Sequence, residues 1–163
     1  MNWKWIDRLA AAFVLAWSLI LYLLTVAPTV SFWDAGEFIA SVYKLQVMHP
    51  PGAPFYMLVG RFFSMLAPSP ETVAFTVNLI SVLASAGTVL LTHLIIVRLV
   101  RTWQGDPDTW TTGQRIIALT SGVVGALTYA ATDSFWFNAV ESEVYALSMF
   151  FTAAVVYLIM RWS

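Results

Sequence analysis

The sequence contains no cysteine and few charged residues. Only 10% of its 163 residues are Asp, Glu, Lys or Arg, whereas about a quarter are charged in an average soluble domain. Without cysteine there is no disulfide, thiolate metal site or cysteine nucleophile. The net charge of −1 provides no basic surface for nucleic acid. The sequence also lacks phosphate-binding glycine loops, dinucleotide fingerprints, zinc-protease motifs and serine-hydrolase elbows.

What the sequence does contain is apolar: 60% of the residues are hydrophobic and 15% are aromatic. Helices that face lipid need such a composition, because they have no other way to match their surroundings. A membrane-spanning helix takes about 17 to 25 mostly apolar residues. Four stretches without Asp, Glu, Lys or Arg reach that length: 9–27, 72–97, 116–132 and 144–160. We therefore predict an all-α, polytopic membrane protein, a single module with four transmembrane helices.

The first stretch is interpreted as a retained anchor. It is long for the apolar core of a signal peptide, and no small-x-small cleavage site follows it. With four crossings, the N-terminus, the loop 98–115 and the C-terminus lie on one side and carry six of the eight basic residues. The segments 28–71 and 133–143 lie on the other side and carry six of the nine acids. Because basic loops stay in the cytoplasm, both termini are predicted to be cytoplasmic and both acidic segments to be outer loops.

The outer segment 28–71 is too rich in apolar residues for a flexible linker. It predicts two short helices, at about 34–48 and 55–66, separated by the proline-rich turn 49–54. Each is too short to span the membrane, and the aromatic residues of the second suit the headgroup level. The loop 98–115 is interpreted as a plain polar turn.

Asp34 and Glu37 follow the first crossing directly. Their spacing puts both carboxylates on one face of a helix at the membrane surface, where unpaired acids are costly. The same spacing also fits a capping box, with Asp34 as N-cap and Glu37 three residues later. From these residues alone, a catalytic pair and a helix cap remain equally open.

A second acidic pair, Glu141 and Glu143, precedes the fourth crossing on the same predicted side. If the backbone there is irregular, both carboxylates can converge on a hard divalent cation such as Mg²⁺ or Mn²⁺. The alternative is a helix cap formed by Asn138 with Glu141, beside ordinary solvated acids. Asp133 is assigned to a helix end.

Two basic side chains of the outer segment have two interpretations each. His49 lies before a Pro-Pro bend that can aim its imidazole, or it is a hydrogen-bonded structural residue. Arg61 pairs with a phosphate or extends along an interfacial helix toward water. Within the crossings, His93 is assigned to packing, and small residues such as Gly122 and Gly125 indicate close helix packing.

The elements Trp33-Asp34-Ala35-Gly36-Glu37-Phe38, His49-Pro50-Pro51 and Val140-Glu141-Ser142-Glu143-Val144-Tyr145 occur in this order after a first crossing. This order resembles the N-terminal part of the GT-C glycosyltransferases. Within that superfamily the strings are similar to bacterial relatives of the transmembrane protein 260 type protein O-mannosyltransferases. The resemblance implies an inverting transfer of a sugar such as mannose from a polyprenyl-phosphate carrier to a hydroxyl acceptor, such as a protein Ser or Thr, outside the bacterial inner membrane.

The resemblance also implies roles for the residues. Asp34 would be the general base and Glu37 its support, while His49 and Arg61 would bind the donor phosphate. A Mg²⁺ or Mn²⁺ ion, if one is used, would be held by Glu141 and Glu143.

GT-C enzymes generally have more than four crossings, so the 163 residues are expected to be a piece of a longer enzyme. Such a piece is expected to be inactive alone and to cover its helix faces by homo-oligomerisation. Two rivals remain. One is a non-catalytic membrane module that binds a lipid headgroup or partner helices. The other is a small transporter subunit, which would need more ionisable residues inside the crossings than His93.

Overall fold

The computed structural model describes residues 3–50, 52–106 and 109–162, and in these residues every regular element is a helix. The all-α prediction is therefore confirmed. The elements, in chain order, are α1 (Trp3–Thr25), α2 (Ala35–Lys44), α3 (Pro54–Met65), the short 3₁₀ helix η1 (Pro70–Thr72), α4 (Val73–Gln104), α5 (Thr112–Ala130), α6 (Asp133–Ala139) and α7 (Val144–Trp162).

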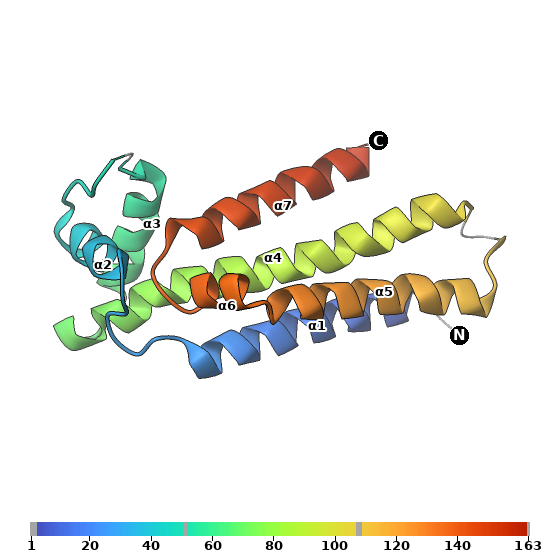
Figure 1. Ribbon diagram of the computed structural model, residues 1–163, viewed down its shortest axis with the longest axis horizontal. Coiled ribbons are helices and arrows are strands. Elements are labelled where there is room, and N and C mark those ends of the chain that lie inside the picture. The colour runs from blue at the N-terminus through green and yellow to red at the C-terminus, as the bar shows by residue number, and fades with distance from the viewer. Residues whose placement is uncertain (1–2, 51, 107–108, 163) are drawn as a thin grey trace.

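Four long helices run side by side as a bundle, with α4 at its centre and α1, α5 and α7 packed against it (Figure 1). Among the described residues, α1, α4 with η1, and α7 are each long and apolar enough to cross a membrane. The helix α5 passes the same test only together with α6, from which it is bent by 71°. The molecule thus has three candidate spans, or four if the bent pair counts as one, as expected for a multi-pass membrane protein.

The loop predicted at 98–115 is much shorter in the structure. Helix α4 continues past Val97 to Gln104 and ends before Gly105, whose φ of 81° ends the helix. The apolar run ends where Arg98 begins a polar stretch, but the helix continues because Arg and Gln are good helix formers. On the other side, α5 begins at Thr112 because Thr111 and Gln114 form a capping box.

The two short helices of segment 28–71 are present and pack against each other and against the first half of α4. Helix α2 ends at Lys44, earlier than predicted, because Leu45 adopts a left-handed conformation with φ 53°. The close packing of α2 on α3 depends on Gly60, since a Cβ there would lie 2.9 Å from the Cβ of Val42 and closer still to a methyl group.

Small residues also bring α5 against α4, as the sequence predicted. A Cβ at Gly122 would lie 2.8 Å from Nδ1 of His93, and one at Gly125 would lie 2.7 Å from Cδ1 of Ile96. Their backbones therefore lie directly against side chains of α4, an arrangement common between membrane helices.

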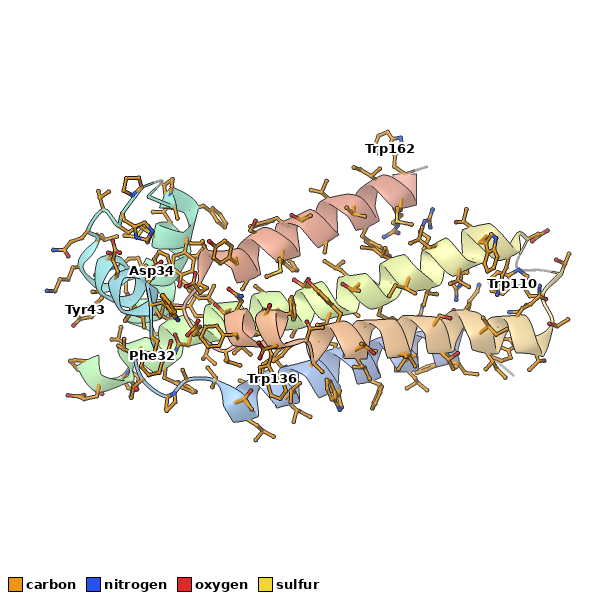
Figure 2. The ribbon with its side chains drawn as sticks, in the orientation of Figure 1. Phe32, Asp34, Tyr43, Trp110, Trp136 and Trp162 are labelled. Atoms are coloured by element: carbon orange, nitrogen blue, oxygen red, sulfur yellow. The ribbon has the colours of Figure 1, made fainter. Side chains whose placement is uncertain are left out.

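The two ends of the bundle carry different segments of the chain (Figure 1). The end that carries 26–50, 52–72 and 131–143 is called the acidic end. The end that carries the N-terminus, the connection from α4 to α5 and the C-terminus is called the basic end. Figure 2 shows Asp34 at the acidic end and Trp110 and Trp162 at the opposite one. The two acidic segments therefore meet at one end of the molecule, as predicted.

Candidate functional site

The site lies at the acidic end, where the start of α2, the turn before α3 and the turn before α7 meet. Ligand atoms of Asp34, Glu37 and His49 lie within 4.8 Å of one another. The sequence placed Asp34 and Glu37 on one helix face but gave no reason to join His49 to them. In the structure residues 45–50 fold back and bring His49 onto that face.

Asp34 occupies the N-cap position of α2 but makes no side-chain capping hydrogen bond. The carboxylate of Glu37 is bonded to His49 instead of reaching back to the start of α2. The capping-box interpretation of this pair is therefore wrong, because a capping box needs a bond from each of the two side chains to the backbone of the first turn. Asp34 is left as an exposed carboxylate with oxygens available to a ligand.

Trp33, immediately before Asp34, has a left-handed backbone with φ 59°. This conformation is strained for a bulky residue, by about 1 to 3 kcal/mol, and such strain clusters at functional sites. The indole itself is 85% exposed, so its packing against the protein is not what holds the backbone there.

Glu37 binds His49 with both carboxylate oxygens. The backbone N–H of His49 donates to Oε1 at 2.6 Å, and Nδ1 lies 2.8 Å from Oε2. This contact lowers the pKa of Glu37 below its ordinary value and raises that of His49, mainly through the side-chain hydrogen bond. The imidazole is therefore favoured in its cationic form, with Nδ1 committed to Glu37.

Glu141 and Glu143 are buried, with 3% and 8% of their surface exposed. They are not solvated acids, and Asn138 does not cap α7, because its amide donates within α6 to the carbonyl of Ser134. Glu141 accepts a hydrogen bond from the hydroxyl of Ser31. Burial raises the pKa of Glu141.

Burial is also the main cause that raises the pKa of Glu143, to about 7, with further contributions from Glu141 and Asp34. The charge of Glu143 in turn raises the pKa of His49. Glu143 is therefore coupled through its charge to Asp34 and His49. The two acidic motifs, more than 100 residues apart in the chain, form one electrostatic unit.

Polar residues on α4 hold the turn that carries the buried acids, and the sequence analysis missed them. Asn78 is fully buried; its amide donates to the carbonyl of Ala27 at 2.8 Å, and its Oδ1 accepts from the hydroxyl of Ser142. The backbone N–H of Glu143 donates to Ser81. Asn78 and Ser81 lie three residues apart in an apolar span, a spacing that puts them on one helix face and could have flagged them.

Arg61 lies elsewhere. Its guanidinium donates to the backbone carbonyl of Tyr43 at 2.5 Å, which joins α3 to the C-terminal end of α2. Of the two side chains assigned to the donor phosphate, the structure thus places His49 in the acidic site and gives Arg61 a structural contact.

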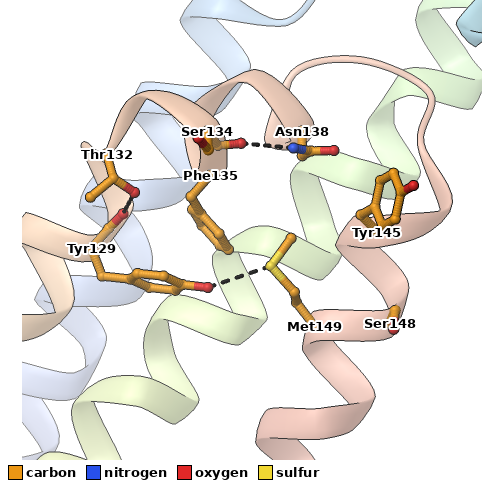
Figure 3. A pocket seen from close by; sticks show the side chains of 8 residues that line it. All are labelled: Tyr129, Thr132, Ser134, Phe135, Asn138, Tyr145, Ser148 and Met149. Atoms are coloured by element: carbon orange, nitrogen blue, oxygen red, sulfur yellow. Dashed lines mark hydrogen bonds between the residues drawn. The ribbon is translucent and has the colours of Figure 1, made fainter.

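Beside the acidic site, a cavity of about 450 Å³ lies between the bent pair α5–α6 and the start of α7 (Figure 3). Most of its surface is apolar, and Thr132, Ser134, Asn138 and Ser148 add hydroxyl and amide groups to the lining. The hydroxyl of Tyr129 donates to the sulfur of Met149 across its floor. A second cavity of about 270 Å³ between α4 and α7 shares Tyr129 and Met149 with it.

Comparison with known proteins identifies the family of the chain. A sequence model of the family described as the protein O-mannosyl-transferase TMEM260 N-terminal domain matches residues 34–163. The chain belongs to this family. The match to the TMEM260 N-terminal domain begins at Asp34 and contains Glu37, His49, Glu141 and Glu143.

Two curated relatives share the TMEM260 name. The protein O-mannosyl-transferase tmem260 of Dictyostelium discoideum is 26% identical over 140 residues, which cover 85% of this chain and 15% of the relative. The protein O-mannosyl-transferase TMEM260 of Mus musculus is 26% identical over 141 residues, which cover 86% and 18%. The chain therefore spans less than a fifth of the length of these TMEM260 relatives. No solved structure matches the chain.

Proposed function

We propose that this chain is the N-terminal membrane module of a GT-C glycosyltransferase. The module would help to transfer a sugar such as mannose from a polyprenyl-phosphate donor to a protein hydroxyl. The observation that carries the proposal is the environment of Asp34, whose carboxylate makes no capping hydrogen bond. It lies beside the Glu37–His49 pair and near two buried acids, at one end of an apolar bundle. The names of the relatives supply the reaction class.

In the proposed reaction Asp34 accepts the proton of the acceptor hydroxyl while its oxygen attacks the anomeric carbon of the donor sugar. The bond from that carbon to the phosphate oxygen breaks, and the polyprenyl phosphate leaves with the electron pair. One displacement inverts the anomeric centre. A positioned base contributes about 10² to 10⁴ in rate. Glu37 cannot share this role easily, because both of its oxygens are bonded to His49.

The departing phosphate needs a cation, and His49 is the best placed candidate. The Glu37 contact favours the imidazolium form, and its Nε2–H remains available to donate. Arg61 would take part only if its bond to Tyr43 opened. A bound Mg²⁺ or Mn²⁺ would supply the same charge. Oxygen ligands for it are offered by the pair Glu141 and Glu143, and by Asp34 and Glu37 together with the His49 imidazole.

The apolar cavities beside α7 suit the hydrocarbon part of the donor. They adjoin one another at Tyr129 and Met149 and run from α6 along the inner face of α7. An isoprenoid chain bound there would hold its phosphate near the turn that carries Glu141 and Glu143. The charge distribution supports an orientation with the basic end in the cytoplasm and the acidic end outside. The proposed membrane is a bacterial inner membrane, as the resemblance of the sequence motifs implies.

The test is sugar transfer by the full-length enzyme carrying Asp34→Asn. We expect turnover to fall by at least about a hundredfold, as for loss of a general base. Asp133→Asn is the matched control, because Asp133 is an exposed acid at the same end that begins α6. Near-normal turnover of Asp34→Asn would remove Asp34 from the base role.

The rival function is a non-catalytic module that binds lipid headgroups or partner helices through its exposed apolar faces. It predicts near-normal transfer for Asp34→Asn, because Asp34 then carries no chemistry and its side chain makes no capping hydrogen bond that could be lost. Thermal unfolding of the same two variants shows whether each protein is folded. Lost transfer with unchanged stability supports catalysis, whereas normal transfer supports the rival.

A further inference from the structure

A small cavity at the basic end takes no part in the proposed transfer. Its volume is about 140 Å³, and α1, α4, α5 and α7 all contribute to its wall. Its polar lining residues are Asp7, His93, Arg98, Arg101 and Tyr157. It lies at the opposite end of the bundle from Asp34 (Figures 1 and 2), so its occupant is a different ligand from the acceptor of the acidic end.

The cavity carries an uncompensated positive charge. Arg101 is paired with Asp7, its Nη2 donating to Oδ2. Arg98 has no carboxylate partner in the part of the chain that the structure describes. Two guanidiniums thus face one carboxylate. Arg98 and Arg101 are three residues apart on α4 and so lie on the same side of the helix.

His93 forms the deeper wall of the cavity. Its side chain is only 2% exposed, and its Nδ1 has no hydrogen-bond partner among the described residues. The Nδ1 edge lies against Gly122 of α5, where a Cβ would come within 2.8 Å. His93 lines the cavity, so the ring atoms that face away from Gly122 are the ones that a ligand there can meet. In the tautomer that carries its proton on Nε2, that N–H can donate to an anion.

We infer that this cavity binds a phosphate group. Each guanidinium can donate two parallel hydrogen bonds to phosphate oxygens, and the imidazole is a third donor group. The volume suits one tetrahedral oxyanion together with a few waters. The apolar run of α4 ends at Val97, so Arg98 and Arg101 lie where lipid phosphates lie. The phosphate belongs either to a phospholipid headgroup or to a dissolved ion, and the experiment distinguishes these sources.

The experiment measures thermal unfolding of the detergent-solubilised full-length protein by tryptophan fluorescence. Inorganic phosphate and short-chain phosphatidic acid are titrated separately, with the corresponding diacylglycerol as the phosphate-free control. We expect a saturable rise in Tm with at least one phosphate probe and none with diacylglycerol. Arg98→Gln should weaken the apparent affinity about tenfold or more, as for loss of a charged hydrogen bond. Arg161→Gln, an exposed arginine at the same end, should behave as wild type.

Each outcome decides one point. A shift with phosphatidic acid alone assigns a lipid headgroup, and a shift with inorganic phosphate assigns a dissolved ion. The inference is overturned if neither probe shifts Tm, or if Arg98→Gln responds as strongly as Arg161→Gln. If Arg98→Gln does not fold, Arg98→Lys decides the matter. Lysine keeps the positive charge but cannot donate two parallel hydrogen bonds to phosphate. Unchanged affinity of Arg98→Lys for the phosphate probe would then contradict the inference.

Discussion

Glu37 binds His49 through both carboxylate oxygens: one accepts a hydrogen bond from the backbone N–H, and the other is hydrogen-bonded to Nδ1 of the imidazole. This contact fastens the His-Pro-Pro turn to the first turn of α2. It also makes the two motifs one structural unit, because the carboxylate sets the position and the charge of the imidazole. The carboxylate oxygens of Asp34, at the start of the same helix, stay available to a ligand because Nδ1 of His49 is hydrogen-bonded to Glu37.

Glu37→Gln should lower the pKa of His49 toward its ordinary value. The pairing stabilises the fold above the unfolded pKa of Glu37, and this stabilisation is lost as pH rises through the raised pKa of His49. In the full-length enzyme the variant should move the alkaline limb of the rate profile to lower pH. NMR of labelled histidine measures the pKa directly, with His49→Gln to identify the signal of His49. An unchanged titration of His49 would contradict this account.

Glu143→Gln should remove a pH dependence of stability. The folded state holds the pKa of Glu143 at about 7, against 4.5 for an unperturbed carboxyl, so it binds more protons than the unfolded state between these values. Stability of the wild type should therefore fall as pH rises through this window, by up to roughly 3 kcal/mol. Tm at about pH 5 and about pH 8 measures the effect. Asp133→Asn, the control, should keep the wild-type slope.

Gly60→Ala should separate α2 from α3. The added Cβ would lie 2.9 Å from the Cβ of Val42, and overpacking of this kind costs about 1 to 3 kcal/mol. The double variant Gly60→Ala with Val42→Ala should recover part of the loss. Gly113→Ala is the control, because the nearest side-chain atom to its Cβ is 3.8 Å away. Calorimetry or fluorescence melting ranks the variants by stability. The prediction is contradicted if Gly60→Ala is as stable as Gly113→Ala.

Asn78→Leu should loosen the turn that carries Glu141 and Glu143. It leaves the carbonyl of Ala27 and the hydroxyl of Ser142 without their partner, at a cost of roughly 1 to 3 kcal/mol. We expect lower Tm together with reduced transfer. Asn138→Ala removes an amide bonded within α6 and should lower Tm much less. Equal losses of Tm in Asn78→Leu and Asn138→Ala would show that Asn78 has no special role in holding the turn.

Much of the helix bundle could be predicted because lipid imposes a simple rule of length and polarity. The ranges 9–27, 72–97 and 144–160 fall within or nearly within α1, α4 with η1, and α7. The rule fails where a helix leaves the hydrocarbon, as at Arg98 to Gln104. It also gives no signal for α6, whose seven residues are too few for a periodicity.

The acidic site was predicted as separate parts and not as an assembly. Asp34 and Glu37 share a helix face, which spacing predicts. The approach of His49 depends on left-handed conformations at Leu45 and Ala53, residue types that rarely adopt them. The burial of Glu143 depends on a turn held by α4 across more than sixty residues of chain. No local pattern contains that information.

Helix α7 packs on α4 and barely touches α6, and Ala146 is its only buried residue. One wall of the cavity in Figure 3 is therefore a helix whose remaining surface faces whatever surrounds the bundle. A membrane helix adjusts its tilt to the thickness of the bilayer. The width of that cavity, and with it the entry of a long-chain ligand, should then follow the acyl-chain length of the host lipids.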